Sequence, residues 1–105
     1  MNILLINHYA GSKEYGMEYR PYYLAKEWVK QGHNVTIVGA AFSHLRLKNP
    51  VVDHDYFKEE VEGICYIWFK TPEYVGSLAR IKNILVFVRK LYKYSKQLVH
   101  DFKPD

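Results

Sequence analysis

The sequence contains a single cysteine, Cys65, so no disulfide can form within the chain. This scarcity fits a reducing, cytoplasmic setting. Long apolar runs are also missing, since no stretch approaches the roughly 18 consecutive apolar residues of a membrane-spanning helix. The first residues lack the basic segment and the apolar core of a signal peptide. Together these absences predict a cytoplasmic protein.

Two common nucleotide-binding motifs are absent as well. Residues 11–16 have the glycine spacing of a P-loop, but Met17 and Glu18 stand where Lys and Ser/Thr are required. The G-x-G-x-x-G fingerprint is missing, and residues 39–41 are Gly-Ala-Ala where a ribose-binding acid is expected. We therefore expect no NAD, FAD or other cofactor. The histidines and Cys65 show no ligand spacing, so no metal site is expected.

The net charge of +4, from 15 basic and 11 acidic residues, is too small to indicate a nucleic-acid partner. Much of the surplus lies in one late segment, whose basic residues are Arg80, Lys82, Arg89, Lys90, Lys93, Lys96 and Lys103. A basic amphipathic helix can lie on an anionic membrane. The alternative is a domain helix that packs an apolar face on a sheet and turns its basic face to water. The two interpretations are compatible.

The first 40 residues alternate between strand and helix patterns. Residues 3–6 form a short apolar run, typical of a parallel strand buried on both faces. Arg20 and Pro21 begin a helix that ends at Gly32. Residues 33–39, rich in β-branched side chains, predict a second strand beside the first.

The rest of the chain predicts one more strand and a long helix. Residues 40–60 look irregular, and residues 61–70 form a strand with apolar side chains on both faces. A helix is expected over residues 78–102, with its apolar positions at Ile81, Ile84, Leu85, Val88, Leu91, Tyr92, Leu98 and Val99. The predicted fold class is α/β, a Rossmann-like three-layer structure with a partial, doubly wound parallel sheet.

The strongest candidate site is the long loop that follows the first strand. It lies at the carboxyl end of the sheet, where open α/β sheets bind ligands. Gly11 and Gly16 allow close approach of the backbone, and Arg20 adds a charge at a helix N-terminus. His8, at the mouth of the expected cleft, can hydrogen-bond a sugar or phosphate. The alternatives are a solvated loop held by its tyrosines and a histidine that caps loop backbone.

A second candidate follows the third predicted strand and borders the same edge of the sheet. Residues 71–83 contain Tyr74 and Arg80, which we expect on the acceptor side of such a site. The alternative is an ordinary connection between the strand and the long helix.

Several segments resemble a known enzyme family. Residues 1–9, 16–23 and 28–38 look like the start of a family 4 glycosyltransferase, most similar to its WbuB-like branch in bacterial surface polysaccharide synthesis. Residues 43–46, 49–50, 63–64 and 70–72 continue the resemblance. It implies a GT-B enzyme, in which two Rossmann-like domains enclose the active site.

The resemblance also implies roles for these residues. The N-terminal domain mainly binds the acceptor, commonly a lipid-linked sugar at the cytoplasmic membrane face. Its first loop reaches the phosphates of the nucleotide-sugar donor, which would bring Gly16 and Arg20 near the cleft. The family retains anomeric configuration and needs no metal.

The family pattern extends beyond these residues. Further strands and a donor-binding domain with a paired-glutamate motif would follow Asp105, so we expect an N-terminal segment without catalytic residues. Its first strand would offer an unpaired apolar edge, which predicts a homo-oligomer. The rival interpretation is a non-catalytic, flavodoxin-like module that dimerises or binds an anionic partner.

Overall fold

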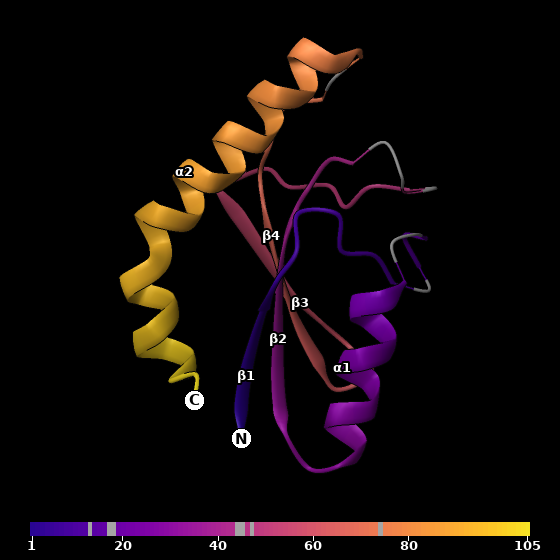
Figure 1. Ribbon diagram of the computed structural model, residues 1–105, viewed down its shortest axis with the longest axis vertical. Coiled ribbons are helices and arrows are strands. Elements are labelled where there is room, and N and C mark those ends of the chain that lie inside the picture. Colours follow the sequence, from indigo (N-terminus) through magenta and orange to yellow (C-terminus); the bar gives the residue numbers. More distant parts are fainter. Residues whose placement is uncertain (13, 17–18, 44–45, 47, 74) are drawn as a thin grey trace.

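The computed structural model is a three-layer α/β structure, described here for residues 1–12, 14–16, 19–43, 46, 48–73 and 75–105. Two helices lie on either side of one open sheet (Figure 1). The elements in chain order are β1 (Asn2–Ile6), α1 (Arg20–Lys30), β2 (Asn34–Ala40), β3 (Tyr56–Val61), β4 (Ile64–Phe69) and α2 (Ser77–Phe102). This arrangement confirms the predicted fold class at the level of α/β with a mostly parallel open sheet.

The sheet has four strands in the order β1-β2-β4-β3. β1 pairs with β2 and β2 pairs with β4 in parallel, which confirms that the first two predicted strands lie side by side. Helix α1 makes the crossover between them, and Gly32 ends the turn after it with a positive φ of 94°. That conformation favours glycine because it has no Cβ.

The expectation that residues 40–60 are irregular is wrong for the end of that range, because Tyr56–Val61 form strand β3, whereas the described residues of 41–55 form no helix or strand. This strand pairs antiparallel with β4 through a two-residue turn at Glu62 and Gly63. Both turn residues have positive φ, 51° and 83°, as in the tight turns that match the twist of a hairpin. The Val61–Lys70 strand of the prediction is therefore the end of β3, a turn, and β4.

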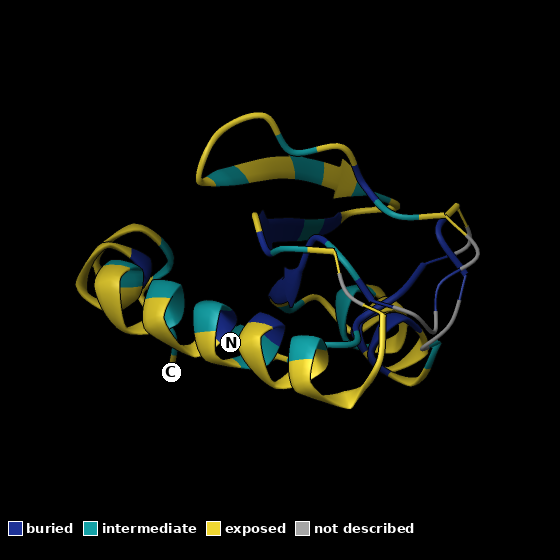
Figure 2. Ribbon diagram, turned by 90° about the horizontal axis from the view of Figure 1, so that it is seen from above, coloured by how far each residue is buried: buried dark blue, intermediate teal, exposed yellow. Residues whose placement is uncertain are grey.

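Each face of the sheet has its own apolar core. Ile64, Tyr66 and Trp68 of β4 pack with α1 on one face. Ile67 and Phe69 pack with α2 on the other. This alternation confirms that β4 is covered on both sides, and Figure 2 shows β4 buried between exposed β3 and the outer surface of α2.

The prediction for the buried face of α2 is mostly wrong. The side chains that α2 buries are Asn83, Phe87 and Leu98, and only Leu98 belongs to the predicted set. The exposed fractions of six other apolar residues exceed one half: Leu78 84%, Ile81 53%, Leu85 63%, Val88 54%, Tyr92 85% and Val99 58%. We call these six residues the α2 stripe. Among the described residues, no helix is long and apolar enough to cross a membrane.

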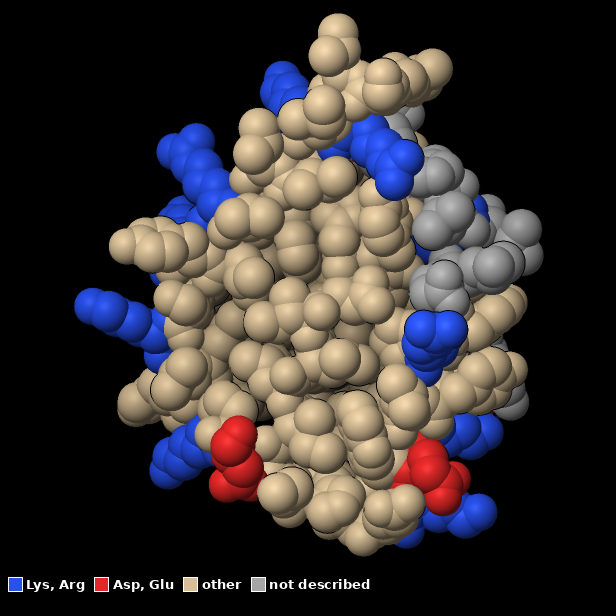
Figure 3. Space-filling view, in the orientation of Figure 1, with Lys and Arg blue, Asp and Glu red and all other residues tan. Residues whose placement is uncertain are grey.

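Charges are distributed unevenly over the surface. Figure 1 looks toward the β1 edge of the sheet, and Figure 2, turned by 90°, agrees that β3 lies farthest from that viewpoint. In the same orientation the centre of the molecule is uncharged, with lysines and arginines gathered at its flanks (Figure 3). The β1 edge of the sheet therefore lies on the face of the molecule that Figure 3 shows, and the centre of this face carries no charged side chain.

Candidate ligand site at the carboxyl edge of the sheet

The loops that follow β1, β2 and β4 all emerge at one edge of the sheet. These three strands are parallel, so their carboxyl ends lie together. Helix α2 begins at the same edge, directly after the loop that leaves β4. Open α/β sheets bind their ligands at this edge. The structure therefore brings both predicted candidate segments to one end of the molecule.

Asn83 joins the three loops through one buried side chain. Its amide nitrogen donates to the carbonyl of Pro72 at 2.7 Å and reaches the carbonyl of Phe42 at 3.5 Å. Its Oδ1 is hydrogen-bonded to Nε2 of His8. Because Phe42 follows β2 and Pro72 follows β4, this residue of α2 fixes the loop ends relative to one another.

His8 thus lies where the sequence predicts, at the end of β1, and is half-buried rather than open to solvent. Its ring meets the ring of Phe87 edge to face, with centroids 5.2 Å apart. The prediction that it binds a sugar or phosphate is untested. The contact with Asn83 gives it a structural role as well.

Arg80, in the first turn of α2, contacts the first loop. Its Nε donates to the hydroxyl of Tyr9 at 2.9 Å, and its guanidinium lies 5.5 Å from the centre of the same ring. The side chain is exposed at the carboxyl edge. Tyr74, predicted with it on the acceptor side, lies outside the described residues.

The two glycines of the first loop are packed inside it. Gly16 and Ser12 exchange backbone hydrogen bonds of 2.8 and 3.1 Å, and Gly16 has a φ of 91°. The carbonyl of Gly11 accepts from the hydroxyl of Tyr66 at 2.9 Å. The loop is therefore a folded unit, and the contact of either glycine with phosphate stays a prediction.

Two tyrosines of this region are buried and hydrogen-bonded. Burial raises the pKa of Tyr15, whose hydroxyl donates to Glu59 at 3.2 Å. Burial and a hydrogen bond to Glu62 raise the pKa of Tyr22 to about 12. Both side chains stay protonated at neutral pH and pin the first loop and α1 to the β3–β4 hairpin.

Arg20 is the first residue of α1 and is exposed. Among the described residues, no side-chain hydrogen bond caps this helix at Tyr19, and the first backbone N–H groups of α1 lie beside the arginine. Such a terminus suits an anion. Both arginines of the predicted site therefore lie in the first turn of a helix.

Arg46 is a buried cation that the sequence prediction gave no role. Its Nε donates to the carbonyl of Ala10 at 2.7 Å, and its terminal nitrogens reach Asn49 and the carbonyl of His8 at 3.2 and 3.3 Å. The guanidinium lies 4.7 Å from the centre of the Trp68 ring. Arg46 therefore ties the first loop to the loop after β2. Its partners are mostly backbone carbonyls, which no sequence pattern reveals.

A shallow cleft lies between the loops that leave β2 and β4. Its lining includes Phe42, Asn49, Pro50, Val52 and Pro72. The backbone N–H of Phe42 donates to the hydroxyl of Thr71 at 3.2 Å, which closes the floor between the two strands. The lining also includes Lys70, Thr71 and Glu73, so the cleft offers both apolar and polar contacts, as a sugar ring requires.

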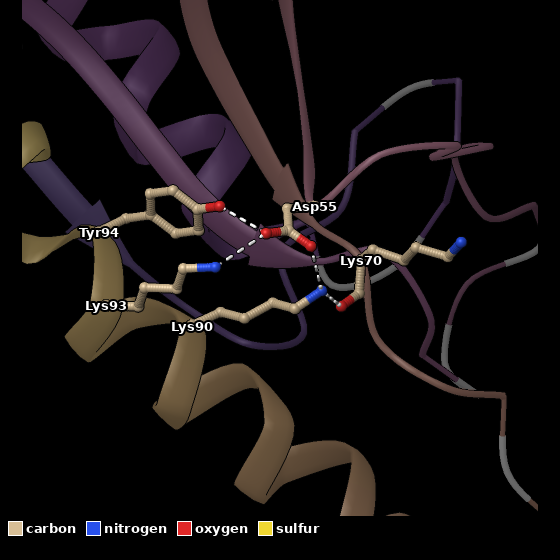
Figure 4. A network of polar contacts seen from close by, with 5 residues as sticks. All are labelled: Asp55, Lys70, Lys90, Lys93 and Tyr94. Carbon is tan, nitrogen blue, oxygen red and sulfur yellow. Dashed lines mark hydrogen bonds and ion pairs between the residues drawn. The ribbon is translucent and has the colours of Figure 1, made fainter.

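A network around Asp55 fastens α2 to the sheet (Figure 4). The Asp55 carboxylate accepts from the Tyr94 hydroxyl at 2.6 Å and from Lys93 Nζ at 3.2 Å. Lys90 Nζ lies 3.7 Å from the same carboxylate and donates to the carbonyl of Lys70 at 2.6 Å. The hydrogen bond from Tyr94 and the two lysines lower the pKa of Asp55 to about 2.

The described residues contain no group of three or more His, Cys, Asp or Glu side chains that could hold a metal. Cys65 lies within β4 and is half-buried, and burial raises the pKa of its thiol. A protonated thiol is a poor nucleophile. The donors at this edge are arginine, amide and hydroxyl groups, which can bind polar or anionic groups.

No family model matches the chain, and the comparisons with curated proteins and with solved structures find no match either.

Proposed function

We propose that the chain is the acceptor-side, N-terminal part of a retaining GT-B glycosyltransferase similar to family 4. The enzyme would transfer a sugar from a nucleotide-sugar donor to a lipid-linked or saccharide acceptor. The observation that carries the proposal is the meeting of His8, Asn83 and Arg80 at the carboxyl edge. These residues come from the two segments that the sequence singled out as candidate sites.

The arrangement suits a diphosphate or a phosphorylated sugar. Arg80 and the Tyr9 hydroxyl form a polar pair beside His8. Arginine binds phosphate through several N–H donors in a fixed plane. This pair would hold the pyrophosphate or sugar of the acceptor, and the cleft beside Phe42 and Pro72 would hold its ring.

Donor binding would rest mainly on a second domain outside these 105 residues. From this chain, Arg20 and the turn at Gly11 and Gly16 would approach the donor phosphates. The amide of Gly16 already donates to Ser12, so the backbone of the loop would need to rearrange to use it. Arg20, exposed at the start of α1, would be the larger contributor.

The acceptor would be presented at the inner face of the cytoplasmic membrane. The outer surface of α2 supports peripheral attachment there, because Lys82, Arg89 and Lys96 are exposed on it. Attraction between such residues and anionic lipids falls as salt rises.

One observation favours a second candidate, a non-catalytic assembly module. β1 is an edge strand, so the sheet can accept a further strand there. A module of this kind would use the β1 edge and would not need the carboxyl-edge arginines.

Titration of the isotope-labelled chain by NMR tests the proposal. Inorganic pyrophosphate and a short prenyl pyrophosphate should shift the amide signals of residues 8–12 and of the first turn of α2. Arg80→Ala should weaken this binding, whereas Arg89→Ala, on the outer surface of α2, should not. UDP- and GDP-sugars should bind at best in the millimolar range, and no sugar transfer is expected from this chain alone. Shifts elsewhere, or binding that is insensitive to Arg80→Ala, would refute the proposal.

A further inference from the structure

Within the described residues, the outer edge of β1 is covered at Asn2 and open beyond it. The backbone N–H of Asn34 donates to the carbonyl of Met1, and the N–H of Asn7 donates to the carbonyl of Val38. The backbone groups of the odd-numbered residues of β1 therefore point toward β2. In a parallel ladder the alternate residues point their backbone groups the other way. Asn2 is one of these, and its N–H and carbonyl pair with Asp105.

The next residues whose backbone N–H and carbonyl point away from β2 are Leu4 and Ile6. Within the part of the chain that the structure describes, β1 has no strand on this side. Backbone groups at an open edge recruit further strands. This edge is short, and it carries no charged side chain, since β1 reads Asn-Ile-Leu-Leu-Ile. Asp105 covers this edge at Asn2, whereas the residues of β1 itself include no charge or proline of the kind that commonly protects edge strands.

The α2 stripe follows a spacing of three and four residues from Leu78 to Tyr92, and Ser95 and Val99 continue it. That is the spacing of the apolar seam between two paired helices. A solvated helix surface gains nothing from six apolar side chains in such a row. The stripe is therefore a second exposed apolar surface, and its spacing suits pairing with another helix.

The stripe lies on the β1 side of α2. Successive residues of a helix are rotated by about 100° around its axis. Around the axis of α2, Lys93 therefore lies on one side of the buried face and the stripe lies on the other. Lys93 and Tyr94 reach Asp55, which precedes β3 at the far edge of the sheet. The stripe consequently flanks the β1 edge, and Figure 3 shows an uncharged surface there.

Helix α1 adds apolar surface on the other face of the same edge. Tyr22 and Lys26 of α1 contact Glu62 in the turn beside β3. By the same rotation, Leu24 and Trp28 lie on the opposite flank, toward β1. Leu24 is 43% exposed. The edge strand is thus bordered by apolar residues on both faces of the sheet.

We propose that the β1 edge and the α2 stripe together form a self-association surface whose partner is a second copy of this chain. The two β1 strands pair antiparallel about a two-fold axis and join the two sheets into one. Such an axis brings the same α2 surface from both copies to one face of the sheet. The proposal does not depend on the proposed glycosyltransferase function.

One register fits the free rungs. With Leu5 on the two-fold axis, Leu4 lies opposite Ile6 of the partner subunit, and the two residues exchange both backbone hydrogen bonds. The pair repeats by symmetry on the other side of the axis. Each Asp105 can keep its place on Asn2, because β1 ends at Ile6 and the chain leaves the ladder there.

A lipid surface explains these features less well than a second copy. Lipid tails offer no donor or acceptor to the backbone of Leu4 and Ile6. Lys93 lies on the flank of α2 that faces Asp55, away from β1, so it does not border the edge strand. A protein partner satisfies both the backbone and the stripe.

Sedimentation equilibrium of the chain over a range of micromolar concentrations tests the proposal. The protomer mass is 12.5 kDa, and a reversible dimer of twice that mass is expected. Leu85→Glu, in the centre of the stripe, should weaken the dimer by at least about 30-fold. Glu60→Lys, exposed on β3 at the edge of the sheet opposite β1, is the control and should change the dissociation constant by less than about threefold.

A second variant probes the strand pairing. Ile6→Pro removes an outward N–H and leaves the β1–β2 ladder intact, so it should also disrupt the dimer. Circular dichroism verifies that each variant is folded. A chain that stays monomeric throughout the range would overturn the proposal, and so would a dimer that tolerates Leu85→Glu. Capture of a monomeric chain by anionic vesicles, lost on Leu85→Glu, would assign the stripe to lipid and likewise overturn it.

Discussion

The side-chain amide of Asn83 donates to the carbonyl of Pro72 at 2.7 Å, so a helix residue holds the loop that leads into its own helix. The same side chain reaches His8 after β1 and Phe42 after β2. A polar residue at the centre of the buried face of α2 therefore organises the carboxyl edge. The loops after β1, β2 and β4 are therefore held in place by Asn83 before any ligand binds.

Asn83→Ala should lower the free energy of unfolding by about 1–3 kcal/mol, because two half-buried carbonyls lose their donor and the buried side chain leaves a cavity. Urea denaturation measures the change. Lys82→Ala is the matched control and should stay within about 0.5 kcal/mol of the parent. Hydrogen exchange should quicken in residues 70–73 of the variant. Unchanged stability would mean that water or a neighbouring donor replaces the amide.

Arg46→Lys should destabilise the chain by about 1–3 kcal/mol, since lysine cannot reproduce the fork that serves Ala10, His8 and Asn49. The variant also loses the planar contact with Trp68, so tryptophan emission should shift. Arg89→Lys, exposed on α2, controls for loss of the guanidinium itself. A stable variant with unchanged emission would contradict a structural role for Arg46.

The strand and helix positions that the sequence predicted best are those with buried, regular patterns. β1, α1, β2 and the two apolar faces of β4 follow from short apolar runs, Gly32 and alternating side chains. Strand β3 was missed because it is an edge strand with Lys58, Glu59 and Glu60 at its centre. The strand is held by its pairing with β4, and the local sequence of residues 56–61 carries no information about that pairing.

The face of α2 could not be predicted for a different reason. The helix carries two sets of side chains at a spacing of three or four residues, one with Asn83 and Phe87 and one with Leu85 and Val88. The spacing and hydrophobicity of the side chains predict that the more apolar set packs on the sheet. In the structure the set with Asn83 packs there instead, and this brings Asn83 to the loops. The carbonyl partners of Asn83 and Arg46 likewise exist only in the folded chain.

Gly39→Ala should destabilise the chain by about 1–3 kcal/mol through overpacking. A Cβ at this position would lie 2.8 Å from the Trp68 ring and 3.3 Å from the Cβ of Ala10. Gly32→Ala separates this effect from backbone strain, because Gly32 has a positive φ but open space around it. If thermal unfolding shows Gly39→Ala to be neutral, the contact between β2 and Trp68 is looser than the structure has it.

The Asp55 network should make stability depend on acid pH. The hydrogen bond from Tyr94 and the two lysines lower the pKa of Asp55 from 3.8 to about 2. The unfolded chain therefore binds the proton more readily, and stability from this group is present above about pH 4 and is lost as pH falls toward 2.

Asp55→Asn should be less stable than the parent at neutral pH and should lose less stability on acidification through that window. Thermal melts at a series of pH values measure both effects. Asp53→Asn, outside the network of Figure 4, is the control and should follow the parent. Parallel curves for the parent and Asp55→Asn would show that the network does not protect the carboxylate.

The basic surface of α2 should give weak, salt-sensitive binding to vesicles that contain anionic lipid. The double reversal of Arg89 and Lys96 to Glu should abolish binding without unfolding the chain, because both side chains are exposed. Lys90→Glu should instead destabilise the fold, since Lys90 lies against Asp55 and the carbonyl of Lys70. Vesicle cosedimentation at rising salt makes the measurement, with neutral-lipid vesicles as the control. Attachment that survives high salt and the double reversal would exclude an electrostatic origin, and with it the peripheral membrane role proposed for this surface.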